Sequence, residues 1–168
     1  MSLSKLFYPT RMLLFRSIVL PHIDYCTSLL LSIQKAQLVV LQKIMNRGMR
    51  IVLKCNKRTP IKQMLDTLKL MNVEQRIYFK TMTLIFKIKN GLLPSYLCEN
   101  VQYVRNIHDY ETRNRDDIFI VKYNTTLVQK STLINGMKLF NEMPTTLKYC
   151  KCFKQFKSNL CKYIYLTK

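Results

Sequence analysis

Residues 34–54 constrain the fold most, because their apolar and basic side chains separate onto two faces of a helix. Apolar side chains recur every three or four residues, and basic ones recur on the other side at steps of four, three and four. This spacing predicts an amphipathic helix with one face in a core and a cationic stripe toward solvent. The expected apolar face is Leu38, Leu41, Ile44, Met45, Gly48, Met49, Ile51 and Val52, and the cationic stripe is Lys43, Arg47, Arg50 and Lys54.

Helical spacing and helix-boundary residues continue through most of the chain. A helix over 10–20 is expected to end at Pro21, with a turn and a further helical segment after it. Asn72 is a candidate N-cap for a helix over 73–89, which Asn90-Gly91 should stop. Other helices are expected over 61–70, 94–100 and 133–141, from Pro144 onward, and in a final amphipathic helix lined by Phe153, Phe156, Leu160 and Ile164.

The sequence changes character after residue 103. Residues 104–117 are polar without helical spacing, which predicts a loop. Residues 118–123 and 126–129 are rich in β-branched and aromatic side chains and predict a small hairpin with Asn124 between its strands. The expected fold is mainly α, an irregular helical bundle with a small β-hairpin in its C-terminal half. The division at 103 and 104 is expected within one continuous unit. Only three glycines in 168 residues also favour helices.

The charge of the chain indicates a polyanionic partner. It contains 28 lysines and arginines against nine acids, a formal net charge of +19. Hydrophobic residues make up 48%, which is too many for a disordered basic tail. No apolar run approaches the roughly 18–20 residues needed to span a bilayer. Nucleic acid, an acidic protein and an anionic membrane surface are the polyanions that suit this charge, and nucleic acid rather than a membrane is the expected partner.

Two stretches carry the basic residues without acids to cancel them. Residues 35–62 contain eight basic residues and no acid, and residues 143–168 contain no acid either. Both stretches suit contacts with RNA or DNA phosphates, although a solvated polar face is the simpler alternative. Most tyrosines and phenylalanines lie at core-facing positions and are expected in the core. The candidate nucleic-acid-binding residues are Lys43, Arg47, Arg50, Lys54, Lys57, Arg58, Lys151, Lys154 and Lys157.

We identify no catalytic or metal-binding motif and expect neither an enzyme nor a cofactor. The six cysteines lack zinc-ligand spacing to the two histidines and are expected to be reduced thiols, most of them filling the core. Asp116-Asp117 has the form of a polymerase metal pair, but Arg113, Asn114 and Arg115 precede it instead of apolar strand residues. We therefore expect this pair in a solvated turn or in local salt bridges.

Five stretches, in order, resemble the region downstream of the polymerase core in reverse transcriptases of non-LTR (LINE-type, jockey-like) retrotransposons. The resemblance extends from about residue 13 to residue 165. The stretches are Leu20 to Cys26 (LPHIDYC), Leu41 to Ile51 (LQKIMNRGMRI), Thr59 to Arg76, Phe86 to Leu97 (FKIKNGLLPSYL), and His108 to Arg113 (HDYETR) with Gly136 to Pro144 (GMKLFNEMP) and the closing helix of Phe153, Phe156 and Lys157.

The resemblance implies that the helical N-terminal half is like a thumb and post-thumb region, which grips a template–primer duplex. It also implies a parent RNA-directed DNA polymerase and a nuclear location. The fingers, the palm and their catalytic aspartates have no counterpart here, and Leu29 to Leu31 and Phe140 stand where the family usually has tryptophan. The chain is accordingly expected to be a truncated, non-catalytic fragment that retains affinity for the template–primer backbone.

Two alternatives remain beside the fragment. The first is a free-standing basic module that binds nucleic acid. The second is an open reading frame without selected function, whose helices would expose apolar surface in the absence of a palm. Cooperative melting distinguishes a stably folded chain from the second alternative.

Overall fold

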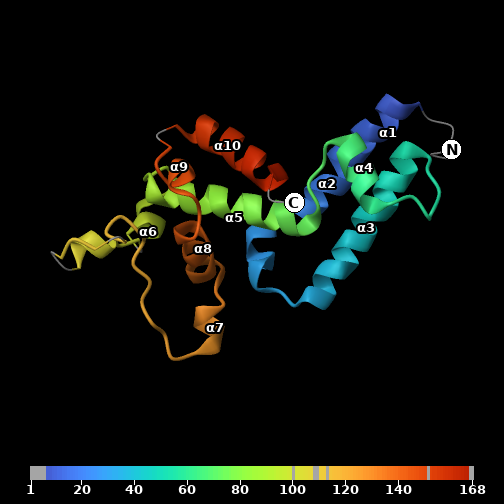
Figure 1. The fold of residues 1–168 in the computed structure, drawn as a ribbon. Coiled ribbons are helices and arrows are strands. Elements are labelled where there is room, and N and C mark those ends of the chain that lie inside the picture. Colours follow the sequence, from blue (N-terminus) through green and yellow to red (C-terminus); the bar gives the residue numbers. More distant parts are fainter. Residues whose placement is uncertain (1–6, 100, 108–109, 113, 151, 167–168) are drawn as a thin grey trace. The chain divides into compact units, whose positions relative to one another are not determined.

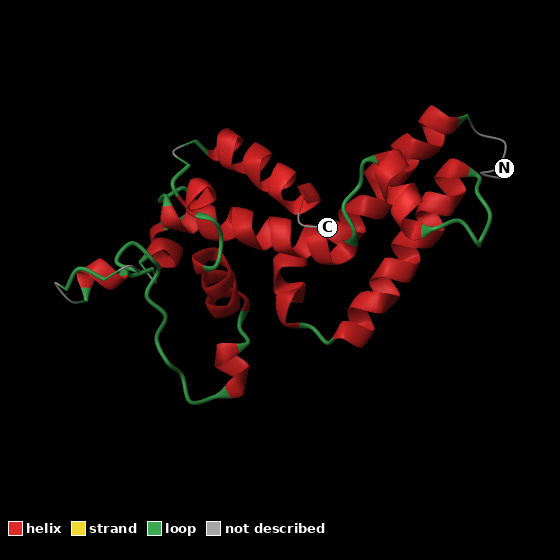
Figure 2. Cartoon of the chain, in the orientation of Figure 1, coloured by secondary structure: helices red, strands yellow, loops and turns green. Residues whose placement is uncertain are grey.

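The structure is a computed structural model that describes residues 7–99, 101–107, 110–112, 114–150 and 152–166. Helices make up 68% of it, which confirms the prediction of a mainly α fold. In the described ranges, strand-like pairing is limited to one antiparallel bridge between Tyr103 and Ile118 (Figure 2). The chain forms two compact units, residues 1–27 with 33–77 (unit 1) and residues 28–32 with 78–168 (unit 2). The division expected at residues 103 and 104 follows sequence character and stays a prediction.

Unit 1 is built from short helices around one long helix. Helices α1, α3 and α4 and the π-helical turn η2 pack against one another. The ion pair of Arg76 with Asp24 joins the start of α5 to the end of α2, with Arg76 Nε 2.8 Å from Asp24 Oδ1. The elements are α1 (Tyr8–Leu14), η2 (Phe15–Val19), α2 (Leu20–Asp24), α3 (Lys35–Leu53), α4 (Ile61–Leu68) and the first residues of α5 (Val73–Lys89) (Figure 1).

The helix expected to end at Pro21 instead continues to Asp24. A π-helical turn follows α1, and in it the backbone N–H of Leu20 donates to the carbonyl of Phe15, five residues earlier. Pro21 then lies in the first turn of α2. Proline is tolerated there because the first N–H groups of a helix have no intrahelical acceptor. The prediction was wrong because it treated the proline as a helix end rather than as the beginning of a new turn.

Helix α3 confirms the predicted amphipathic helix, but its buried face is narrower than expected. Met45, Met49 and Val52 are at most 1% exposed, whereas Ile44 and Ile51 are 51% and 44% exposed. At about 100° per residue, these two isoleucines point roughly 100–120° away from Met45. Their assignment to the apolar face was therefore wrong. The buried stripe also includes Asn46, which accepts a hydrogen bond from Gln42 at 2.8 Å.

Gly48 allows α3 to lie close to η2. A Cβ atom at this position would lie 2.3 Å from Cε2 of the Phe15 ring. Phe15 is itself 3% exposed, so the ring has little room to move. A side chain at residue 48 would therefore force the two elements apart.

Helix α5 begins at the residue that the sequence indicates. The Asn72 side chain accepts a hydrogen bond from the Gln75 backbone at 2.7 Å, and the Gln75 side chain accepts one from the Asn72 backbone at 3.0 Å. This reciprocal pair is a capping box, which satisfies two N–H groups that the helix leaves free. Gly91, with φ of +64°, follows the other end, as predicted from Asn90-Gly91.

Replacing Asn72 with alanine should lower the free energy of unfolding by about 1 kcal/mol, because the Gln75 N–H would lose its acceptor. Urea denaturation followed by circular dichroism measures this change. Asn72→Ser provides the matched control, since serine also caps helices and should retain most of the stability. An equal loss in both variants would contradict a capping role.

Unit 2 contains the remainder of α5 and the shorter C-terminal helices. Phe86 of α5 stacks on Phe156 of α10, with ring centroids 4.1 Å apart and planes inclined by 15°. Gly136 of α8 lies against α5, where an added Cβ would be 2.9 Å from Thr81 Cγ2. The further elements are α6 (Ser95–Cys98), η4 (Val104–Asn106), α7 (Thr126–Gln129), α8 (Thr132–Asn141), α9 (Thr145–Lys148) and α10 (Phe153–Leu166), and a 3-10 helix, η3 (Thr27–Ser32), precedes α3.

The β-hairpin expected over residues 118–129 is absent, and this prediction was wrong. Residues 126–129 form α7. The backbone of Ile118 pairs instead with the Asn141 side chain, which donates to its carbonyl at 2.8 Å and accepts from its N–H at 3.0 Å. Phe119 N–H donates to the carbonyl of Gln102 at 2.7 Å. These partners are distant in the sequence from Ile118 and Phe119. The segment therefore has the composition of a strand, but it does not pair with residues 126–129 to form a hairpin.

Methionine fills much of the core of both units. The side chain of this residue is flexible and fits irregular spaces between helices. All the methionines within the described residues are at most 9% exposed. They are Met12, Met45, Met49, Met64, Met71, Met82, Met137 and Met143.

Candidate nucleic-acid interface

Three of the four cations predicted to form the basic stripe of α3 are exposed. Lys43 and Arg47 are one turn apart, and Lys54 follows at the end of the helix. Lys54 has φ of +52°, and this left-handed residue ends α3. The exposed Val40 and Ile44 lie beside the cations, so apolar groups border the basic stripe. Lys43, Arg47 and Lys54 are thus all exposed, and that they act as one surface stays a prediction.

Arg50 differs from the other cations of the predicted stripe. Its side chain is half-buried, and its Nε atom is enclosed without a hydrogen-bond partner among the described residues. At about 100° per residue, Arg50 points roughly 60° from Arg47, toward the buried stripe rather than away from it. The prediction that Arg50 lies on the solvent face was therefore wrong for its Nε atom, which is enclosed.

Lys57 and Arg58 occupy the centre of a tight turn after α3. The Thr59 N–H donates to the Asn56 carbonyl at 3.1 Å and closes this turn. Both basic side chains are exposed. A closed turn limits the backbone movement of its central residues, so the two cations extend the basic surface that begins on α3.

The C-terminal lysines belong to unit 2 and form a separate group. Lys154 and Lys157 are exposed on α10, one turn apart. Lys151 lies outside the described residues. The cations of α3 belong to unit 1 and those of α10 to unit 2, so they form two candidate surfaces.

Four carboxylates of the chain form ion pairs with basic residues that are not among the candidate nucleic-acid-binding residues. Asp24 pairs with Arg76, Glu111 with Arg115, and the aspartates 116 and 117 with Arg105 and Lys148. Within the described ranges, no ion pair involves the candidate cations, namely Lys43, Arg47, Lys54, Lys57, Arg58, Lys154 and Lys157. Their charge is therefore available to an external anion.

Asp116 and Asp117 form local contacts with basic and phenolic groups, as the sequence predicts. Lys148 Nζ lies 2.9 Å from Asp117 Oδ1, and the Tyr149 hydroxyl lies 3.0 Å from Asp116 Oδ2. Lys89 is close enough that the two carboxylates act on its ammonium, although burial lowers its pKa overall. The neighbouring cations neutralise both carboxylates and link the 114–118 turn to α9.

A groove on unit 2 was missed by sequence reasoning. It has a volume of about 520 Å³ and runs along α10 beside Phe79 of α5. Its wall on α10 repeats at helical spacing, which could have shown that these residues share a face. Helical spacing could not have identified Phe79 as part of the groove, because this residue reaches it only through the packing of α5 against α10. The lining residues are Phe79, Lys154, Lys157, Ser158, Cys161, Lys162 and Tyr165.

The cysteines do not fill the core, contrary to expectation. Cys26 and Cys152 are exposed, and the other four are half-buried. Cys161 lies within α10, and the others lie near helix ends or turns. All six are free thiols. The described residues contain no cluster of three or more histidine, cysteine or acidic side chains suited to a metal ion. In the same part of the chain, no helix combines the length and the apolar character required to cross a membrane.

Comparison with protein-family models, curated proteins and solved structures found no match to this chain.

Proposed function

We propose that the chain binds RNA or DNA through the phosphate backbone, with the cations of α3 and the following turn as the principal contacts. The observation that carries this proposal is the absence of ion pairs at these exposed cations in the described residues. Unpaired lysines and arginines on one surface attract a polyanion and release its counterions on binding.

A solvated polar face accounts less well for this distribution of charge. Such faces usually mix both signs, which favours solubility without a directed field. Residues 25–65 contain no acid. Lys43 and Arg47 on α3 and Lys57 and Arg58 in the turn therefore act without a neighbouring carboxylate in sequence. The arrangement suits a partner that carries regularly spaced negative charge.

The proposal includes the relation to non-LTR retrotransposon reverse transcriptases. The ordered stretches that resemble the thumb and post-thumb region support it, and they favour a duplex as the ligand of α3. We assign binding and no catalytic step to the chain. An aromatic-x-Asp-Asp motif encoded in the DNA upstream of the Met1 codon would support this relation, and unrelated regulatory sequence there would count against it.

Binding to a duplex should weaken steeply as salt increases. With about five cations on phosphates, the logarithm of the affinity should fall linearly with the logarithm of the salt concentration, with a slope between about −4 and −5. From ~50 to ~200 mM salt this is a loss of several hundredfold. Fluorescence anisotropy of a labelled duplex of about 20 base pairs measures the slope.

A duplex of unrelated sequence serves as the control, because phosphate contacts carry no direct sequence information. Equal slopes for both duplexes are expected. Absence of binding at ~50 mM salt, or affinity that is indifferent to salt, would overturn the proposed function.

A further inference from the structure

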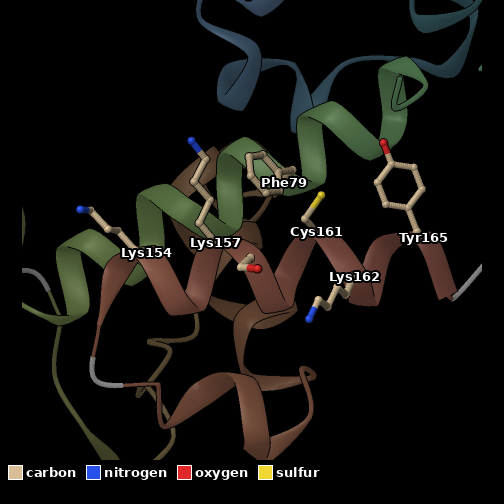
Figure 3. A pocket seen from close by; sticks show the side chains of 7 residues that line it. Phe79, Lys154, Lys157, Cys161, Lys162 and Tyr165 are labelled. Carbon is tan, nitrogen blue, oxygen red and sulfur yellow. The ribbon is translucent and has the colours of Figure 1, made fainter. Parts of the chain in front are cut away.

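The groove on unit 2 combines an open aromatic ring with basic side chains. Figure 3 shows Phe79 on α5 near Cys161 of α10, with Lys154 and Lys157 extending toward the α5 side of α10. Lys162 extends toward the other side of the helix in the same view. Phe79 is half-buried, so part of the ring remains open to the groove.

The packing of α10 explains why this ring is left open. Phe156 covers Phe86 in the core, and seven residues earlier on α5 the groove places Cys161 and Tyr165 beside Phe79. The two helices therefore run antiparallel. Among the described residues, no aromatic ring stacks on Phe79 as Phe156 stacks on Phe86. An aromatic surface of this kind can stack on a planar group from outside.

The charge around the groove selects the kind of planar group. Residues 143–166 contain no acid, and Lys154 and Lys157 form no ion pair within the described ranges. A ligand that combines a planar ring with negative charge complements both features. Nucleotides have this chemistry, and aromatic stacking with backbone contacts by lysine is how many proteins hold single strands.

We propose that the α10 groove binds an unpaired nucleotide of single-stranded nucleic acid, with its base on Phe79 and the adjoining phosphates on Lys154 and Lys157. This inference rests on the proposed function, because it requires that the chain binds nucleic acid. It adds a second site with a different preference, since the bases inside a duplex have no free face to stack on Phe79.

Phe79→Trp tests the stacking directly. The chain contains no tryptophan, so this variant carries a single indole reporter. A single-stranded oligonucleotide of about 12 thymidines should quench its fluorescence, because the base stacks on the indole. Phe119→Trp is the matched control: Phe119 is 36% exposed in the same unit and away from the groove, and its indole should remain unquenched.

Affinity provides an independent measurement in the full chain. Phe79→Leu keeps an apolar side chain and should weaken binding of the single strand roughly five- to 30-fold, with little effect on a duplex. Lys157→Gln should weaken binding of the single strand more than Lys130→Gln, although both remove one exposed charge from unit 2 and Lys130 lies outside the groove. An abasic oligonucleotide should not distinguish Phe79→Leu from the unaltered protein.

The outcomes separate this inference from the proposed function. Binding of the single strand without quenching of Phe79→Trp, and with equal effects of the two lysine variants, overturns the groove site and leaves the proposed function standing. Quenching by anionic phospholipid vesicles but not by oligonucleotide also overturns it, because the ligand would then be a membrane surface. If the unaltered protein binds neither single-stranded nor duplex nucleic acid, both proposals are overturned.

Discussion

Replacing Lys43, Arg47, Lys54 and Lys57 with glutamine should lower the affinity for duplex nucleic acid by about two orders of magnitude at ~50 mM salt. Each side chain is exposed and forms no ion pair within the described residues. Each lost phosphate contact should also reduce the salt slope by roughly 0.9. Anisotropy titrations at several salt concentrations measure affinity and slope together. Arg50 is left intact, because its enclosed Nε makes a substitution there a change in packing as well as in charge.

The matched control removes four charges elsewhere. Lys80, Lys122, Lys130 and Lys138 are exposed and lie outside both candidate surfaces. Their replacement with glutamine lowers the formal net charge equally but should leave the slope close to that of the unaltered protein. Equal losses in the two variants would mean that net charge, rather than the surface formed by α3 and the turn, determines binding. Unchanged affinity in the first variant would mean that the cations of α3 and the turn do not contribute to binding.

Replacing Phe156 with alanine should lower the free energy of unfolding of unit 2 by about 3–5 kcal/mol. The side chain is fully buried, and its ring is stacked on Phe86 at 4.1 Å. The variant loses buried apolar area, leaves a cavity and breaks the stack, and these losses together are a large part of the stability of an ordinary domain. Thermal and urea denaturation by circular dichroism measure the change.

Phe156→Leu is the control for this variant. Leucine keeps most of the apolar contact and loses the ring stacking, so it should cost much less than alanine. The unaltered protein should unfold in a cooperative transition. Broad, non-cooperative melting that neither substitution changes would favour an open reading frame without selected structure.

Sequence reasoning succeeded where the signals are local. Asn72 marks the start of α5 because its cap uses Gln75, only three residues away. The periodicity of α3 likewise lies within one helix. The hairpin failed because the backbone partners of Ile118 include Asn141, 23 residues away, and no local pattern encodes that pairing.

The candidate site was predictable in part for the same reason. Lys43 and Arg47 share a face by helical spacing alone, so the sequence identifies them. The inward position of Arg50 depends on what packs against α3, and Phe79 depends on the antiparallel placement of α10 beside α5. These two features arise from tertiary packing, which charge and periodicity do not describe.

The methionine-rich core has a chemical consequence. Met45, Met64 and Met82 are completely shielded from solvent, so a dissolved oxidant such as hydrogen peroxide reaches their thioethers only when the surrounding helices open. Oxidation then converts each thioether into a polar sulfoxide, which hinders its return to the apolar interior. Brief opening is thereby turned into lasting damage, and the sulfoxide content of each unit becomes a record of how often that unit has opened.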